Sequence, residues 1–383
     1  MKRPIYLDYM STTPVDQRVI ARMSQYLGYD GDFGNPASVT HSYGWTASST
    51  VEEARSQVAD LINAEAGEIL WTSGATEANN LAIKGAARFY QRWDKHIVVC
   101  MTEHKSVLDV CEQLGREGFE ITYLRPQLDG RIDLDDLEKA LRPDTLLVSI
   151  AHVNNEIGVI QDIQAISEIT HARGVLLHVD AAQSAGKIPI DVKKMRVDLM
   201  SFSAHKVYGP KGVGVLYIRN EPNLHIEPLF NGGPQERGLR PGTLATHQIV
   251  GMGEAFKIAK QELHTDNARI LQLRQRLWQG LQSQITDIHL NGSEVHRVAG
   301  NLNVSFLGPK DAATLISRLS EEVAVSSGSA CLANRGEKPS FVLLALGLSE
   351  EIARSSIRFT LGRFTTQADI DTVIEEVVKA VKA

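Results

Sequence analysis

Two side chains of complementary chemistry follow apolar runs near the middle of the chain. Residues 176–180 form a run that ends on Asp180, and residues 201–206 form a second run that ends on Lys206. The carboxyl ends of neighbouring parallel strands are where α/β sheets place their ligands. Pyridoxal phosphate needs a lysine for a Schiff base and an acid that keeps its pyridine nitrogen protonated. The pair therefore fits this cofactor, and a buried Asp–Lys ion pair without chemical consequence is the alternative.

A second feature suits an anion such as the phosphate of that cofactor. Residues 72–79 follow a short apolar run and open a helix. Free backbone N–H groups and the helix dipole attract a phosphate at such a start. Gly74 permits close approach and Thr76 adds a hydroxyl. An ordinary helix cap with Glu77 in the first turn is the alternative.

Polar residues also follow other apolar runs. His104 can stack on a planar cofactor and move protons near neutral pH, and a surface histidine is its alternative. Residues 154–158 follow the run 146–152, and their amides can bind a phenolic oxygen or a carboxylate, or simply form a turn. Near the C-terminus, Arg358 and Arg363 could bind a substrate carboxylate in bidentate fashion. An internal salt bridge is the alternative, and it suits Arg363 better than Arg358.

The three cysteines lie in different settings, and their odd number argues against a disulfide framework. Cys100 closes an apolar run, which predicts the end of a buried strand. Cys111 shares helical spacing with apolar neighbours, which predicts a core position. Cys331 closes the small, polar stretch 326–331, where a thiol can move and react.

The elements that must position these residues alternate between short apolar runs and amphipathic helical patterns, which predicts an α/β protein with a largely parallel sheet. The predicted strands are 97–101, 121–124, 146–152, 175–179, 198–203 and 213–218, and the predicted helices between them include 51–63, 76–91, 105–117 and 163–173. A long helix over 251–283 precedes a smaller lobe with a strand at 301–306 and helices at 311–320 and 368–382. We therefore expect a large domain over 16–255 and a small domain formed by 1–15 and 256–383.

Composition sets the limits on partners and location. The net charge of −6 and the absence of a Lys/Arg-rich run argue against a nucleic-acid partner. Residues 1–20 lack the apolar centre of a signal peptide, and no segment has the length of a membrane span. We expect a cytoplasmic protein with no membrane association.

Taken together, five motifs resemble the cysteine desulfurase family, which is related to the class-V aminotransferases, and specifically its housekeeping iron–sulfur-cluster branch. The resemblance runs from Tyr6 to Thr366, and the motifs are 33–38, 72–77, 152–158, 203–206 and 326–331. It implies a fold-type I, pyridoxal-phosphate-dependent transferase of the aspartate aminotransferase kind. That fold has a large domain with a mostly parallel sheet and a smaller α/β domain, which carries a mobile cysteine loop near 326–339.

The resemblance also implies roles for individual residues. Lys206 would form the Schiff base, His104 would lie over the cofactor ring and Cys331 would be the nucleophile. The other implied cofactor contacts are Asp180 at the pyridine nitrogen, Gln183 at the phenolic oxygen, Ala75, Thr76, Ser203 and His205 at the phosphate, and Thr243 at the phosphate of the other subunit of a homodimer. Asn155 and Arg358 would bind the substrate carboxylate.

The implied reaction converts L-cysteine to L-alanine and leaves a persulfide on Cys331. That sulfur would pass to acceptor or scaffold proteins for iron–sulfur cluster assembly, with tRNA thiolation as a second outlet. No resident metal is expected, although Cys331 could serve as a transient iron–sulfur ligand with a scaffold. A selenocysteine lyase or related β-eliminating enzyme is the alternative, which the complete stretch 326–331 disfavours. A non-catalytic partner protein is a second alternative, which the intact Lys206, Asp180, His104 and Cys331 disfavour.

Four features depart from the family pattern. Pro234 stands where a third glycine is usual, and Ala204 replaces a usual glycine. Residues 332–339 are longer and more basic than expected, and the sequence ends at Ala383 without the tail that engages a scaffold. From the last two we expect weak transfer to a conventional scaffold, with Arg335 and Lys338 attracting an acidic acceptor instead.

Overall fold

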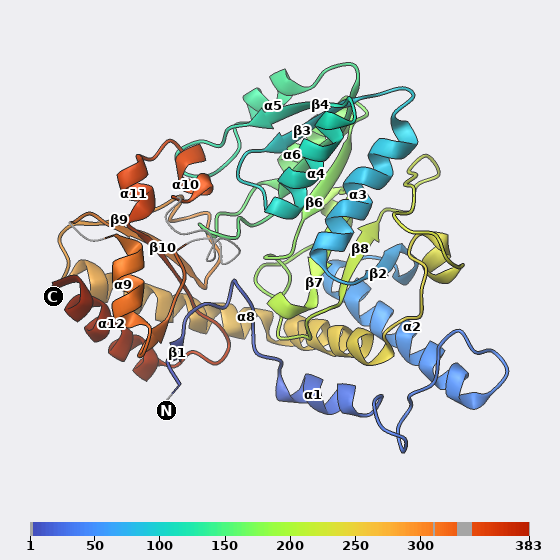
Figure 1. Cartoon of the computed structure of the whole chain (residues 1–383), viewed down its shortest axis with the longest axis horizontal. Helices are drawn as coiled ribbons and strands as arrows, with labels where there is room; N and C mark the ends of the chain where they lie inside the picture. The colour runs from blue at the N-terminus through green and yellow to red at the C-terminus, as the bar shows by residue number, and fades with distance from the viewer. Residues whose placement is uncertain (1–2, 309–310, 328–338, 383) are drawn as a thin grey trace.

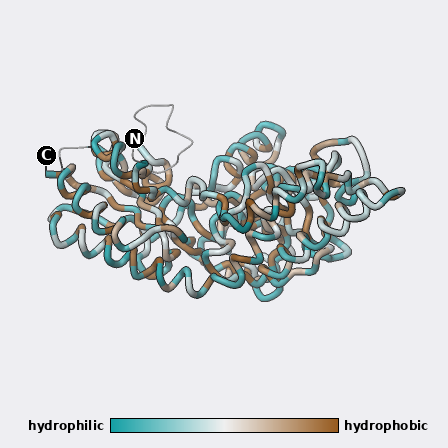
Figure 2. The backbone as a smooth tube through the Cα atoms, turned by 90° about the horizontal axis from the view of Figure 1, so that it is seen from below, coloured by the Kyte–Doolittle hydropathy of each residue, from teal (hydrophilic) through white to brown (hydrophobic). Residues whose placement is uncertain are grey.

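The computed structural model describes residues 3–308, 311–327 and 339–382. Within them the chain forms a large lobe and a small lobe, which lie side by side along one long helix (Figure 1). Seen from below, apolar stretches run through the inside of each lobe, and hydrophilic stretches follow the outer helices and loops (Figure 2).

The large lobe is built on a sheet of seven strands in the order β2-β8-β7-β6-β5-β3-β4. Neighbouring strands are parallel except around β8, which runs antiparallel to both β7 and β2. The prediction of a largely parallel sheet is therefore confirmed. The bounds are β2 Ile69–Thr72, β3 His96–Cys100, β4 Glu120–Leu124, β5 Thr145–Ala151, β6 Leu176–Asp180, β7 Leu199–Ser203 and β8 Gly214–Ile218.

Both faces of this sheet are covered, because alternate side chains along a strand point in opposite directions and nearly all of them are apolar. One set packs against α2 (Ser42–Ile62), α6 (Ile163–Ala172) and the first half of α8 (Thr246–Gln282). The other set packs against α3 (Ala75–Tyr90) and α4 (Lys105–Arg116). Cys100 ends β3 and Cys111 lies on α4, and both are buried as predicted.

The small lobe has its own core. Its main sheet places β10 (Asn301–Phe306) between β12 (Ser356–Thr360) and β9 (Ile288–Leu290), all antiparallel. The N-terminal strand β1 (Ile5–Tyr6) joins this lobe by pairing in parallel with β11 (Val323–Ala324). Its helices are α9 (Ala312–Leu319), α10 (Phe341–Ala345), α11 (Glu350–Arg354) and α12 (Gln367–Lys382), beside the second half of α8.

Helix α8 connects the two lobes without interruption. It has 37 residues and so a length of about 55 Å. Its buried residues belong to the large-lobe core up to Ala259 and to the small-lobe core from Ile270. The predicted domain boundary between residues 255 and 256 thus falls inside a continuous helix and stays a prediction.

The long helix begins five residues before its predicted start. It continues through two glycines near that end, and these glycines allow close packing. A Cβ on Gly251 would meet Met23 of α1 (Gln17–Ser24) at 2.7 Å, and a Cβ on Gly253 would meet Ala54 of α2 at 2.7 Å. The glycines therefore allow α8 to approach its neighbours rather than ending it. The remaining helices are α5 (Leu134–Ala140), α7 (Val192–Met195) and the short 3-10 turns Ala66–Glu68, Ala204–Lys206 and Gln235–Gly238. Among the described helices none is long and apolar enough to cross a membrane.

Candidate active site

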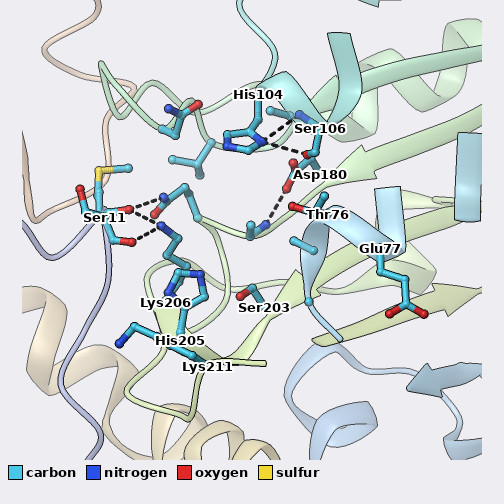
Figure 3. Close-up of a pocket in the computed structure, with 18 of the residues that line it drawn as sticks. Ser11, Thr76, Glu77, His104, Ser106, Asp180, Ser203, His205, Lys206 and Lys211 are labelled. Carbon is cyan, nitrogen blue, oxygen red and sulfur yellow. Dashed lines mark hydrogen bonds between the residues drawn. The ribbon is translucent and has the colours of Figure 1, made fainter. Parts of the chain in front are cut away.

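A cavity of about 430 Å³ lies at the carboxyl ends of the parallel strands, where it also meets the small lobe (Figure 3). Ten of the twelve predicted site residues line it, whereas Thr243 does not and Cys331 lies outside the described residues. The ten are Ala75, Thr76, His104, Asn155, Asp180, Gln183, Ser203, His205, Lys206 and Arg358. They come from the ends of β2, β3, β5, β6 and β7 and from β12, so the sheet edge gathers side chains that are far apart in the sequence.

Asp180 is the last residue of β6 and is buried at the floor of the cavity. Its Oδ2 accepts a hydrogen bond from Asn79 Nδ2 at 2.8 Å, and its Oδ1 accepts one from the backbone N–H of Ala182 at 2.9 Å. Asn79 Nδ2 also donates to Ser106 Oγ at 2.9 Å, and Ser106 Oγ lies 2.8 Å from His104 Nδ1. A continuous hydrogen-bonded path therefore connects Asp180 to His104, through two residues that the sequence interpretation gave no role.

His104 is the N-cap of α4, and a backbone amide determines which of its ring nitrogens accepts a hydrogen bond. Its Nδ1 accepts a hydrogen bond from the backbone N–H of Ser106 at 3.1 Å. A ring nitrogen that accepts from a backbone amide carries no proton, so in the neutral ring the proton sits on Nε2. The alternative of a solvent-exposed loop histidine is excluded, because the ring is half-buried and lines the cavity.

Lys206 ends the 3-10 turn Ala204–Lys206, three residues after β7, rather than the strand itself as predicted. Its Nζ donates to the backbone carbonyls of Met10 and Ser11, at 2.6 Å each. These carbonyls belong to the N-terminal segment, which crosses from the small lobe to the cavity (Figure 3). The sequence interpretation missed both residues, because a backbone carbonyl leaves no signal in the side-chain pattern.

The predicted anion site lies at the start of α3. Gly74 is the N-cap and supplies no side-chain cap, so the Thr or Ser cap of the alternative interpretation is absent, although Glu77 does lie in the first turn. Glu77 turns to other partners, since it accepts from the backbone N–H of Ser73 at 2.7 Å and from Arg240 Nε at 2.9 Å. The N-terminal residues Ala75 and Thr76 line the cavity with their helix dipole directed at it.

Three further residues border this end of the cavity. Ser203 ends β7 and His205 follows it, with Nδ1 of His205 3.1 Å from Thr12 Oγ1. Burial lowers the pKa of His205 to about 4, and the charges of Lys206, Lys211 and Lys187 act in the same direction. His205 is therefore neutral near pH 7. Lys211 also lines the cavity, as an exposed cation that the sequence interpretation did not single out.

Arg358 enters the cavity from β12 and is 2% exposed. Its guanidinium donates to Asp8 Oδ1 at 2.8 Å, to Ser11 Oγ at 2.8 Å and to the backbone carbonyl of Asn155 at 2.7 Å. Its buried Nε has no hydrogen-bond partner among the described residues. Arg358 thus combines an internal ion pair with an unsatisfied N–H group beside Asn155.

Arg363 makes the internal salt bridges that the sequence favoured for it. Its guanidinium binds Asp16 Oδ2 at 2.8 Å and Asp266 Oδ2 at 2.9 Å. Neither contact faces the cavity, which Arg363 does not line. The two arginines therefore differ as expected, with one beside the cavity and one joining α8 to the N-terminal segment.

Thr243 lies in a separate hollow of about 270 Å³, together with Pro36 and Glu236. Glu236 has a left-handed backbone conformation with φ of 48°, and its carboxylate holds Arg55 and the backbone N–H of Trp71, at 2.8 Å in each case. Pro234, one of the departures from the family pattern, precedes this turn with ordinary helical angles. Thr243 therefore cannot serve the cavity of its own chain in this arrangement.

The two described cysteines are poor nucleophiles. Burial raises the pKa of both Cys100 and Cys111 to about 12, so neither forms a thiolate near neutral pH. Cys331, Arg335 and Lys338 lie outside the described residues. Within the described residues no group of three or more His, Cys, Asp or Glu side chains could hold a metal ion.

The donor set of the cavity fits pyridoxal phosphate. A buried carboxylate, a lysine and a neutral histidine surround the cavity, and an uncapped helix N-terminus with two neighbouring hydroxyls borders one end. The carboxylate suits a protonated ring nitrogen, the lysine a carbonyl carbon and the helix start a phosphate. Such a combination has no evident structural purpose at a sheet edge.

Comparison with known proteins agrees with this chemistry. The Aminotransferase class-V family matches residues 5–373, which defines the class of protein. Cysteine desulfurase IscS of Shewanella sp. (strain ANA-3) is 58% identical over 381 residues, which cover 100% of this chain and 93% of that protein. A solved NifS-like protein superposes with a TM-score of 0.92 at 36% identity, over 99% of both chains. SspA, solved in complex with cysteine, gives a TM-score of 0.83 at 37% identity, over 94% of this chain and 100% of that one. The chain belongs to the cysteine desulfurases within the class-V aminotransferase family.

Proposed function

We propose that the protein binds pyridoxal phosphate and converts L-cysteine to L-alanine, leaving the sulfur as a persulfide on Cys331 for iron–sulfur cluster assembly. The C–S bond of cysteine breaks and its carbon takes up a proton, while a new S–S bond forms on Cys331. The substrate carbon is thereby reduced and the thiol of Cys331 oxidised, so no external oxidant is required. The observation that supports this most is the placement of Asp180 and Lys206 on one cavity at the ends of β6 and β7.

The bound cofactor would supply an electron sink for the pair of electrons released at the substrate Cα. Asp180, fixed by Asn79 and Ala182, would hold a proton on the ring nitrogen. The phosphate would be bound by Ala75, Thr76, Ser203 and His205. Because His205 is neutral, it would bind the phosphate as a hydrogen-bond donor. Gln183 would reach the phenolic oxygen from the end of β6.

Lys206 would hold the cofactor covalently and then move the Cα proton once the substrate amine has replaced it. Its present partners, the carbonyls of Met10 and Ser11, would keep the released amine beside the reacting carbon. Asn155 and Arg358 would bind the substrate carboxylate, for which the Nε–H of Arg358 is available. His104 would lie against the ring and carry a proton on Nε2.

Three further parts of the proposal concern partners and location. We expect a homodimer, in which Thr243 of each chain contributes to the cavity of the other. Acceptor or scaffold proteins would take the persulfide sulfur, with tRNA thiolation as a second outlet. A cytoplasmic location stays a prediction.

Labelled cysteine tests the proposed function directly. Protein loaded with pyridoxal phosphate and given ³⁵S-cysteine should release alanine and carry label that dithiothreitol removes. Peptide mass spectrometry should place the extra sulfur on Cys331. Release of sulfide with pyruvate in place of alanine would show a β-eliminating enzyme, and protein that takes up no cofactor would contradict the proposal as a whole.

A further inference from the structure

A second lysine, Lys187, lies beside the cavity, in a narrow hollow that Met10 and Lys206 also line. Lys187 belongs to the turn that follows β6, and its Nζ donates to Gln183 Oε1 at 2.6 Å. Its backbone carbonyl accepts from Asn267 Nδ2 of α8 at 2.7 Å, and its backbone N–H donates to Ser184 O at 3.0 Å. Lys187 is therefore held in place from both sides, with its ammonium aimed at one oxygen.

That oxygen determines how the amide of Gln183 is oriented. Lys187 Nζ donates in this contact, so Gln183 turns Oε1 towards Lys187, and in the charged form of the lysine an ammonium group can only donate. On the other side, Gln183 Nε2 donates to the carbonyl of Met10 at 2.9 Å, and a carbonyl can only accept. Both neighbours thus require the same orientation, since a flipped amide would place N–H against ammonium and oxygen against oxygen.

The same carbonyl connects this pair to Lys206. Met10 O accepts from Gln183 Nε2 and from Lys206 Nζ, at 2.9 and 2.6 Å. One hydrogen-bonded chain therefore connects Lys187, Gln183, Met10 and Lys206. It begins beside the cavity and ends inside it. Gln183 lines the cavity, and the second hydrogen of its Nε2 is free to serve a ligand there.

Charges around Lys187 are mostly positive. A narrow hollow beside it is lined by Lys206, Tyr9, Tyr208, Asp266 and Arg363, and Asp266 is already engaged by Arg363 at 2.9 Å. His205 is neutral and Arg358 lies on the cavity side. Burial lowers the pKa of Lys187 to about 7, with the charges of Lys206 and Arg358 as further causes. A lysine whose pKa is lowered beside a cavity is typical of functional sites, although structural charge networks also lower pKa values.

We propose that Lys187 is a positioning residue, which fixes the amide of Gln183 with its NH₂ group towards the cavity and places positive charge behind the phenolic edge of the cofactor. This inference rests on the proposed binding of pyridoxal phosphate. An N–H donor and a nearby cation both stabilise the phenolate oxygen. Both also oppose protonation of the nitrogen atom that would join the cofactor to Lys206. Loss of Lys187 should therefore make that nitrogen easier to protonate.

The visible absorption band of the bound cofactor measures this protonation without turnover. In Lys187→Met and Lys187→Gln, the midpoint of the band's pH titration should rise by up to about one unit, because both variants remove the charge that Lys187 carries below about pH 7. In Lys187→Met the equilibrium dissociation constant for pyridoxal phosphate should rise by about tenfold, from the loss of one oriented hydrogen bond. Lys193→Met is the matched control, since Lys193 is an exposed lysine paired with Glu65 on the surface, and it should leave both values as in the parent.

The two variants separate positioning from stability. A purely structural role would lower the thermal midpoint and leave the band titration of the folded protein unchanged. Lys187→Gln keeps a polar group of similar length, so it provides the result if Lys187→Met does not fold. An unchanged titration midpoint in a folded Lys187 variant would overturn this inference alone. A parent protein that shows no band would instead contradict the proposed cofactor.

Discussion

The backbones of Ser326 and Arg358 are hydrogen-bonded to each other in both directions. The N–H of Arg358 donates to Ser326 O at 2.7 Å, and the N–H of Ser326 donates to Arg358 O at 3.4 Å. The side chain of the same Arg358 lines the cavity. The chain that leads towards Cys331 is therefore fixed, at Ser326, to the residue proposed to bind the substrate carboxylate.

Arg358→Lys should raise KM for cysteine by about tenfold or more and lower kcat less. A lysine cannot reproduce the planar fork of N–H groups, although it keeps the charge opposite Asp8. Alanine release measured over a range of cysteine concentrations gives both constants. Arg363→Lys is the matched control, because its partners are Asp16 and Asp266, and it should lower the melting temperature while KM stays the same. Equal effects of both variants on KM would contradict the assignment.

Lys206→Ala should bind cofactor without the visible band of the parent. No other group would form the covalent bond, so borohydride should leave no pyridoxyl mass on any peptide. In the parent the mass should appear on the peptide that contains Lys206. Lys193→Ala, an exposed lysine on the same lobe, should label as the parent does. A modified Lys206→Ala protein would show that a different amine carries the cofactor.

Cys331→Ser should keep the visible band and its change on addition of cysteine, yet form no persulfide. A hydroxyl is a far weaker nucleophile towards sulfur than a thiolate. Cys111→Ala provides the control, since burial holds the pKa of that thiol at about 12, and it should form persulfide normally with a stability loss of about 1 kcal/mol. Sulfide release by Cys331→Ser at the parent rate would favour a lyase.

Stability should fall as pH drops from about 6.5 to about 4. Burial lowers the pKa of His152, His178 and His205 to about 4, below the value of about 6.5 in an unfolded chain. In this window the unfolded state binds more protons than the folded state, so acid favours unfolding. Calorimetric melting temperatures at successive pH values measure the slope. His152→Gln should reduce the slope, whereas His264→Gln, on the exposed face of α8, should leave it unchanged.

Glu103→Gln should be nearly neutral for stability, in contrast to most changes of a buried acid. Burial raises the pKa of Glu103 well above its usual value, so the site favours the uncharged form of the carboxyl, which an amide resembles. Its Oε1 accepts from the backbone N–H of Ala151 at 2.8 Å, and an amide oxygen can do the same. Chemical denaturation should show a change of about 1 kcal/mol or less. A large loss would mean that Glu103 is charged in the folded protein.

Whether a part of the fold or of the site could be predicted from the sequence depended on the kind of chemical group involved. Asp180 and His104 were predictable because each lies at the end of an apolar run, and parallel strands bring such positions to one edge, whereas Ser203 was assigned through the family resemblance. The strand and helix ranges agreed for the same reason, apart from a residue or two at the ends and the early starts of α2 at Ser42 and of α8 at Thr246. Strands that are buried on both faces appear in the sequence as nearly continuous apolar runs, which makes their positions easy to find.

The supporting residues were not predictable. Met10 acts through its carbonyl, which every residue possesses, and Asn79 acts through a contact between α3 and β6 that only the fold creates. Glu236 adopts a left-handed backbone conformation, with φ of 48°, that its residue type does not indicate. Lys187 received no role from the sequence, because its contact with Asn267 of α8, which lies far along the chain, exists only in the fold.

Helix α8 also constrains how the two lobes can move. Between Glu254 and Gln279 it contains neither glycine nor proline, so there is no weak point between the core of one lobe and the core of the other. A wide hinge opening would break backbone hydrogen bonds in the middle of a continuous helix. Entry of substrate and delivery of sulfur must therefore depend on local segments around a rigid frame. Heating should melt both lobes in a single cooperative transition, since neither can lose its half of this helix alone.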